Sequence, residues 1–130
     1  RVEKELAHVF DHYGMGLTTW SPLASGVLSG KYANGIPPGS RLSQESMAWM
    51  REEALSQKRQ AQLQSFCTFA KDLNCTPAQL AIAWCLRNKN VSSVITGASS
   101  PEQVKENMRA FTVYQTVDAP VWSQIEKLFA

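Results

Sequence analysis

Apolar side chains recur at intervals of three and four residues along several segments of the chain, and this spacing predicts amphipathic helices. The first covers residues 2–13 and ends at Gly14, since glycine readily adopts the left-handed conformation that terminates a helix. Further helices are predicted over residues 63–73, from Thr76 onward, and after Asp118. Residues 111–117 are predicted to form an irregular connector.

Two short apolar runs, residues 15–20 and 91–98, are bounded by turn-forming residues and predict buried strands. Strands that alternate with helices are typical of parallel α/β folds, in which ligands bind where the strands end. Trp20 stands at the end of the first strand and Ser99 just beyond the second. A ligand site is therefore expected among the residues that follow these strands.

The helix that begins near Thr76 carries the clearest local signals. Thr76 and Gln79 have the spacing of a capping box, and Pro77 lies at the first turn. Residues 80–86 are apolar almost all round, which predicts that this helix is buried on more than one side.

The segment after the first strand is suited to an anionic ligand. Residues 20–31 offer backbone donors, hydroxyl side chains and glycines that allow close approach, and they end in Lys31. Stacking on Trp20 at one end and anion recognition at the other suggest a nucleotide. The glycine spacing, and Tyr32 after the lysine, exclude a Walker-type ATPase loop. An ordinary strand-to-helix loop is the alternative interpretation.

Two further groups of residues extend this hypothesis. Lys31 and Arg41 lie in a long loop segment, residues 21–53, and are expected to fold over one anion from two sides, although simple solvation also explains them. After the second strand, the predicted helix start directs backbone N–H groups toward a ligand. Ser99 and Gln103 would hold a phosphate there, unless they serve only as capping residues.

Composition limits the possible partners. The chain has 130 residues and a formal net charge of +2, and its basic residues alternate with acidic ones, so no nucleic-acid partner is expected. The three cysteines lack C-x-x-C spacing, and His8 and His12 lack a third ligand, so no metal site is expected. The longest apolar run is far shorter than the ~20 residues of a membrane span. A cytoplasmic protein without direct membrane insertion is therefore expected.

Two segments together identify a family. They are residues 20–31 and the sequence V-S-S-V-I-T-G-A-S-S-P-E-Q-V-K-E-N at residues 91–107, with the run L-A-I-A-W-C-L-R-N between them. The combination resembles the aldo-keto reductases, specifically the branch of the voltage-gated potassium channel beta subunits. It matches the C-terminal portion of that family.

The resemblance implies an α/β fold, namely the C-terminal portion of a (β/α)8 TIM barrel with its last two strands and their helices. Residues 1–130 would form the nucleotide-binding half of one barrel domain, with the N-terminal part absent. Because two strands cannot close a barrel, the chain is expected to be part of a protein of roughly 300 residues.

The resemblance also implies NADPH as the cofactor. In the family, the Trp20 position stacks on nicotinamide and the Ser21-Pro22-Leu23-Ala24-Ser25 positions wrap the pyrophosphate. The remaining implied contacts are Lys31 and Arg41 with phosphates, Gly97, Ser99 and Gln103 with the adenosine 2′-phosphate, and Glu106 and Asn107 with adenine. The departures from the family pattern are Ser25, where channel subunits of animals commonly have cysteine, Gly39, where they have an aromatic residue beside adenine, and Gly97 and Gln103, where other reductases have Lys and Arg.

The implied function is NADPH-dependent reduction of a small aldehyde or ketone by hydride transfer. The family's catalytic Asp, Tyr, Lys and His or Asn come from earlier strands, so no catalytic residue is assigned and this segment alone is expected to be inactive. The alternative is a cytoplasmic channel beta subunit that uses bound NADPH as a redox sensor, with a channel alpha subunit as partner. A cofactor-free interaction fragment is a third possibility. A homo-oligomer, a tetramer by family resemblance, is also expected.

Overall fold

The computed structural model describes residues 2–130 and contains a small parallel sheet. Its strands are β1 (Leu17–Thr19) and β2 (Val91–Val94), with an irregularity in register after Leu17. Just before β1, a side chain on Gly16 would collide with Ser92, so glycine lets the two strands approach each other. The sequence predicted both strands, although each is shorter than the apolar run that indicated it, and the prediction that they are buried was wrong, since every strand residue is half-buried or exposed.

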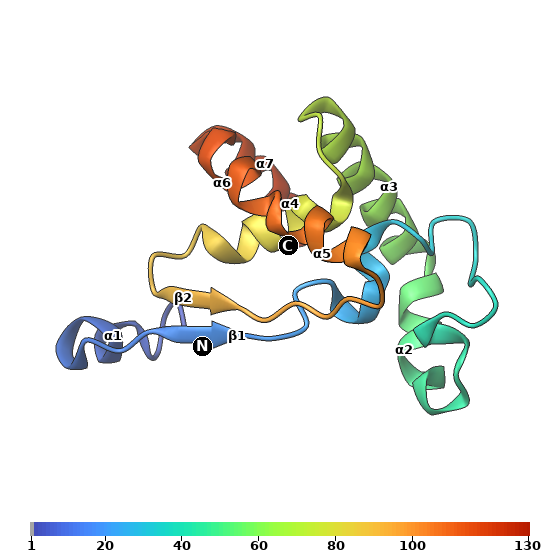
Figure 1. Ribbon diagram of the computed structural model, residues 1–130, viewed down its shortest axis with the longest axis horizontal. Helices are drawn as coiled ribbons and strands as arrows, with labels where there is room; N and C mark the ends of the chain where they lie inside the picture. Colours follow the sequence, from blue (N-terminus) through green and yellow to red (C-terminus); the bar gives the residue numbers. More distant parts are fainter. Residues whose placement is uncertain (1) are drawn as a thin grey trace.

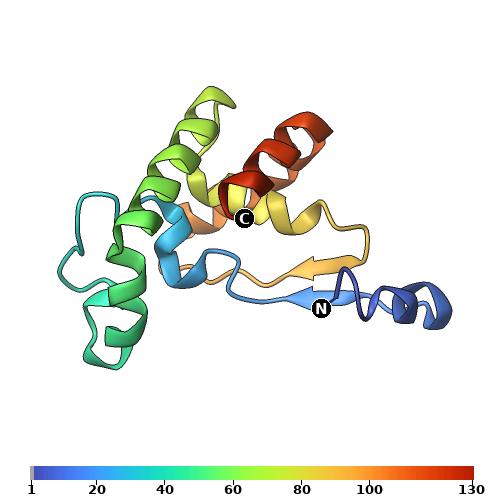
Figure 2. The same ribbon diagram turned by 180° about the vertical axis from the view of Figure 1, so that it is seen from behind.

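Helices surround this sheet unevenly. Helices α3 to α7 lie on one side of it, whereas the opposite side is bare in both ribbon views (Figures 1 and 2). The α-helices are α1 (Ala7–Tyr13), α2 (Ala48–Leu55), α3 (Gln57–Asp72), α4 (Pro77–Leu86), α5 (Pro101–Met108), α6 (Ala110–Thr116) and α7 (Ala119–Leu128). Three short 3-10 helices, η1 (Ala24–Ser29), η2 (Arg41–Ser43) and η3 (Glu45–Met47), lie between β1 and α2.

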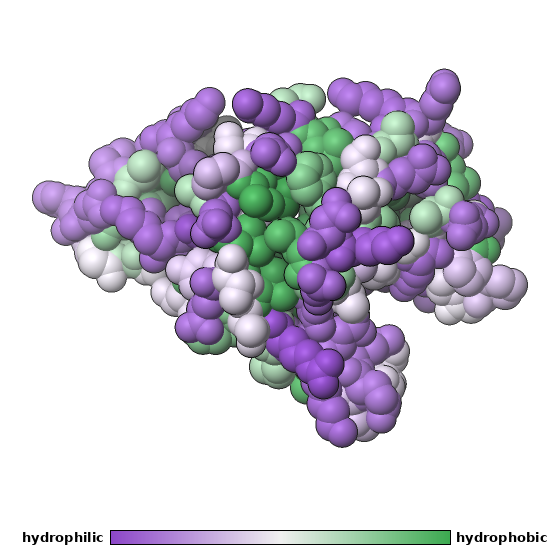
Figure 3. Space-filling view, turned by 90° about the horizontal axis from the view of Figure 1, so that it is seen from above, coloured by the Kyte–Doolittle hydropathy of each residue, from purple (hydrophilic) through white to green (hydrophobic). Residues whose placement is uncertain are grey.

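Helix α4 is the centre of the fold. It contacts β2, η1, α3, α5 and α6, and its residues 78–83 are all buried, which confirms the prediction from its apolar surface. The predicted capping box is also confirmed, because the Gln79 N–H donates to the Thr76 hydroxyl at 3.2 Å and Gln79 Oε1 accepts from the Thr76 N–H at 3.1 Å. Apolar side chains gather near the middle of the helical face, with polar ones around them (Figure 3).

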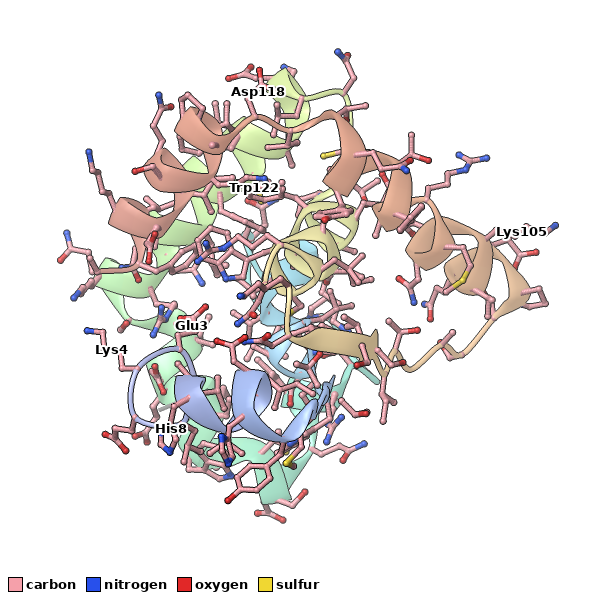
Figure 4. The ribbon with its side chains drawn as sticks, turned by 90° about the vertical axis from the view of Figure 1, so that its left-hand side faces the viewer. Glu3, Lys4, His8, Lys105, Asp118 and Trp122 are labelled. Carbon is pink, nitrogen blue, oxygen red and sulfur yellow. The ribbon has the colours of Figure 1, made fainter. Side chains whose placement is uncertain are left out.

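Aromatic side chains join α4 to α7. Trp122 is buried and points inward from α7 (Figure 4), where its ring meets Trp84 edge-on at 5.9 Å. Arg87 also contacts Trp84, since its guanidinium lies 3.9 Å from the centroid of the Trp84 ring. The same guanidinium lies 3.8 Å from the carboxylate of Glu126 on α7. The two helices are therefore held by ring packing and a half-exposed ion pair.

Several boundaries differ from the predictions. The predicted connector at residues 111–117 was wrong, since residues 110–116 form α6 and Val113 packs in the main core. The first helix is confirmed to end at Gly14, which has a φ of 62°, but it begins only at Ala7. Helix α3 begins earlier than predicted, because Ser56 caps it through the Arg59 N–H.

Candidate functional site

The two strands end side by side, and the residues that follow them lie at one edge of the sheet (Figure 1). The Ile95 N–H donates to the Thr19 carbonyl at 2.8 Å, which extends the pairing past the last strand residues. Trp20 comes next and is 80% exposed. An exposed tryptophan at the carboxyl end of a parallel strand is available as a stacking surface.

The backbone after Trp20 adopts an uncommon conformation. Ser21, Ala24 and Ser25 have φ values of 52°, 46° and 58°, and Gly26 follows with 93°. Left-handed conformations cost about 1–2 kcal/mol for residues with a side chain, and such residues cluster at binding sites. The only other non-glycine residue with positive φ among residues 2–130 is Asn74, beyond the end of α3.

This loop also leaves backbone donors unused. The N–H groups of Ala24 and Gly26 donate to the carbonyls of Ser21 and Leu23. Those of Leu23 and Ser25 make no backbone hydrogen bond within the described part of the chain. Successive N–H groups in a turn of this kind form a concave surface that favours anions.

Lys31 lies against this loop. Its side chain passes the α-carbon of Gly26, where an added Cβ would be 2.7 Å from the lysine Nζ. The ammonium lies 5.0 Å from the ring centroid of Tyr32, within the range of a cation–π contact. Lys31 remains exposed, so its charge is accessible beside the loop.

Arg41 is the first residue of η2, in the segment that connects η1 to α2. Its guanidinium is exposed, while the next residue, Leu42, is fully buried and fixes the turn. Arg51 of α2 also holds the turn, since its Nε donates to the Leu42 carbonyl at 2.8 Å. The structure thus presents Arg41 from an anchored segment.

The segment after β2 is ordered by side-chain hydrogen bonds. Gln103 Oε1 accepts from the Ser99 N–H at 2.8 Å and from the Ser99 hydroxyl at 3.1 Å. Ser100 caps α5 by accepting from the Gln103 N–H at 3.3 Å. Ser100 and Gln103 are therefore engaged as the capping alternative expected, although Gln103 itself is exposed.

Gly97, Glu106 and Asn107 complete this side. An added Cβ on Gly97 would meet no atom within 4 Å, so its backbone is open to a ligand. Asn107 is only 5% exposed, and its Nδ2 donates to the Gly97 carbonyl at 3.5 Å, so this nitrogen supports the loop. Glu106 is half-buried, and its backbone carbonyl accepts from Gln79 of α4 at 3.2 Å.

Two buried hydroxyl oxygens adjoin these residues without a hydrogen-bond partner among the described residues. They are Thr19 Oγ1, next to Trp20, and Ser40 Oγ, next to Arg41. Buried polar groups are nearly always paired, so unpaired ones mark places where something else can bind. Sequence reasoning did not select either residue, because single hydroxyls in polar segments carry no distinguishing pattern.

Tyr32 was also missed. It is fully buried, and its hydroxyl lies within hydrogen-bonding distance of both the Ser25 carbonyl and the Leu42 N–H. The available signal was that Tyr32 is the only aromatic residue between Trp20 and Trp49.

A separate apolar groove lies between η1, α2, α3, α4 and α7. Its volume is about 340 Å³, and Pro22 and Ala24 line it together with Phe66, Trp84 and Ile125. Trp20 and Gln103 do not line it. Of the predicted nucleotide-binding residues, the groove is thus lined by Pro22 and Ala24 alone, whereas Trp20 and Gln103 follow the two strand ends.

Other candidate chemistry is weak. His8 points outward from α1 (Figure 4), and no group of three metal-ligating side chains occurs in residues 2–130. Burial raises the pKa of the thiols of Cys67, Cys75 and Cys85, which disfavours the reactive thiolate. In the same range, no helix combines the length and apolarity needed to cross a bilayer.

Comparison with known proteins decides the family. A sequence profile of the aldo/keto reductase family matches residues 1–130. The chain belongs to the aldo/keto reductase family. This confirms the assignment that residues 20–31 and 91–107 indicated.

One protein similar to this chain is named as a channel subunit. The "Probable voltage-gated potassium channel subunit beta" of Oryza sativa subsp. japonica is 46% identical over 127 residues. These residues are 97% of the chain but 39% of the rice protein, so the aldo/keto reductase chain described here spans less than half of its relative's length.

Proposed function

We propose that this chain is the NADPH-binding, C-terminal portion of an aldo-keto reductase barrel. The observation that carries the proposal is the left-handed run at Ser21, Ala24 and Ser25, which leaves backbone N–H groups unused directly after an exposed Trp20. Strain of this kind is retained where a ligand needs the conformation. The assignment to a barrel is supported by the parallel pairing of β1 with β2 and by the sheet that they form, one face of which no helix covers (Figure 2).

The residues fit the parts of a dinucleotide. Trp20 offers its ring to nicotinamide, and the Ser21–Ser25 backbone offers donors to the pyrophosphate. Lys31 and Arg41 supply positive charge, and Gly97, Ser99 and Gln103 are proposed to contact the 2′-phosphate. Glu106 and the buried Asn107 would order the adenine side. When bound, NADPH supplies hydride, and these residues hold and orient it.

The intact protein is proposed to reduce small aldehydes or ketones. Family membership supports this activity, and its test is aldehyde-dependent oxidation of NADPH by the intact protein. Absence of turnover across a panel of aldehydes and ketones would overturn the enzymatic part of the proposal while leaving nucleotide binding to be measured directly.

A second candidate is a channel beta subunit that senses the redox state of bound NADPH. Similarity to the rice protein, which is named as a probable channel beta subunit, favours it, and this candidate brings a channel alpha subunit and a homo-oligomer as proposed partners. Co-purification of the intact protein with the cytoplasmic part of a potassium channel tests this candidate. Failure to associate under conditions where NADPH binds would remove it.

Arg41 provides the sharpest test of the assigned cofactor. Arg41→Ala is expected to raise the Kd for NADPH by roughly tenfold or more and that for NADH much less, because a charge-assisted contact to the 2′-phosphate is lost. Lys58→Ala is a matched control, since Lys58 is an exposed cation on α3. Equal losses for NADPH and NADH would contradict the role of Arg41.

A further inference from the structure

Tyr32 contacts both segments that carry the cations of the proposed site, Lys31 and Arg41. Its side chain is 0% exposed, although Lys31 beside it is exposed. A buried tyrosine hydroxyl and a buried backbone N–H each need a hydrogen-bond partner. Here the Leu42 N–H donates to the Tyr32 hydroxyl at 3.3 Å, and that hydroxyl donates to the Ser25 carbonyl at 3.5 Å.

These two hydrogen bonds join segments that secondary structure does not connect. Ser25 belongs to the left-handed run after β1, whereas Leu42 lies in η2 directly after Arg41. The bonds span seven and ten residues along the chain. The Tyr32 hydroxyl therefore links the Ser25 loop to the Arg41 turn, in addition to the packing of Val27 against Leu42.

The ring of Tyr32 makes a third contact. The Lys31 ammonium lies 5.0 Å from its centroid, in the space that Gly26 leaves open. Tyr32 also belongs to a small core cluster, whose apolar side chains hold its ring in place. The other buried members are Val27, Leu42, Ala54 and Leu63. The ring thus supports one cation while the hydroxyl anchors the turn that carries the other.

We infer that Tyr32 is a positioning residue of the nucleotide site, which fixes Arg41 relative to the Ser25 loop and thereby sets discrimination for the 2′-phosphate. The inference rests on the proposed NADPH function and adds a residue that touches no ligand. It acts through Arg41, so the preference for NADPH over NADH depends on it more than dinucleotide binding in general does.

Tyr32→Phe in the intact protein tests this inference, because phenylalanine keeps the ring and its packing and removes only the hydroxyl. The Kd for NADPH is expected to rise roughly five- to tenfold, and that for NADH less than twofold. The Leu42 amide, which loses its acceptor, is expected to exchange its hydrogen faster. Tyr114→Phe makes the same change on exposed α6 and is expected to alter neither quantity.

A second control separates positioning from general loss of stability. Ile125→Val weakens the other core cluster, around Phe66 and Leu80, and is expected to lower the melting temperature without changing the ratio of the two Kd values. If Tyr32→Phe leaves that ratio at the wild-type value while wild type binds NADPH, the inference is wrong and the proposed function stands. If wild type binds neither nucleotide, the proposed function itself fails, and the inference with it.

Discussion

Gly26 shows how one residue serves the loop backbone and a neighbouring charge together. Its φ of 93° suits glycine, and the end of the Lys31 side chain occupies the space where a Cβ would be. Gly35 is a natural comparison, since its φ is 106° and an added Cβ would meet nothing within 4 Å. The two glycines share a positive φ, which residues with a side chain rarely adopt, but differ in what surrounds them.

Gly26→Ala and Gly35→Ala are therefore expected to have similar effects on stability and different effects on binding. Each should lower the free energy of unfolding by about 1–2 kcal/mol, because alanine is disfavoured at positive φ. Only Gly26→Ala should weaken NADPH, since it displaces the flexible end of Lys31. Chemical denaturation and nucleotide titration of the intact protein measure the two effects. Equal NADPH affinity in both variants would argue against a role for Lys31.

The cysteines give a prediction about pH. Burial raises the pKa of the Cys67, Cys75 and Cys85 thiols, so less thiolate is present at a given pH than for a free cysteine. Alkylation by iodoacetamide should be slow near about pH 7 and accelerate toward about pH 10. Mass spectrometry of the folded protein, compared with the protein unfolded in urea, measures this. Folded-state rates that equal the unfolded ones at neutral pH would contradict the effect of burial.

At the scale of elements, the start of α4 is the most sharply defined boundary. Thr76→Ala removes the hydroxyl that accepts from the Gln79 N–H and should lower the free energy of unfolding by about 1 kcal/mol. Thr68→Ala, on the exposed face of α3, should change it by less than about 0.5 kcal/mol. Denaturant titration of both variants checks the difference. A loss for Thr76→Ala no larger than that for Thr68→Ala would mean that the capping box contributes little.

The elements that could be predicted from sequence are those with local signals. The capping box at Thr76 and the terminating Gly14 are formed by residues within a few positions of each other, so their pattern is visible in the chain. Helix α6 has no such signal, because its aromatic and β-branched residues have low helix propensity. It is helical because Val113 and Ala110 pack into the interior, next to α4. The contacts that favour this helix are made with residues of α4, which are distant from it in the sequence.

The candidate site follows the same division across the whole molecule. Trp20 and Gln103 could be selected because parallel strands bring their carboxyl ends to one edge, and the pairing of β1 with β2 confirms that arrangement. Tyr32 and Ser40 were not selected, because their importance arises from contacts between segments and from burial. Sequence reasoning thus identified residues suited to touch a ligand and missed those that support them.

At the scale of the whole molecule, apolar surface is left uncovered. The sheet has two strands, and one face is bare (Figure 1). Val104, Met108 and Phe111 are exposed apolar residues on α5 and α6. Parallel sheets are normally covered on both faces, so binding experiments belong on the intact protein.

The central claim is that the loops after β1 and β2 bind opposite ends of one dinucleotide. Its most direct test is calorimetric titration of intact variants with NADPH and with adenosine 2′,5′-bisphosphate, which lacks nicotinamide. Trp20→Ala should raise the Kd for NADPH about tenfold and leave the bisphosphate unaffected, whereas Gln103→Ala should weaken both ligands. Trp49→Ala, at a tryptophan that is 65% exposed on α2, should change neither. Unchanged NADPH affinity in both the Trp20 and Gln103 variants would contradict the claim.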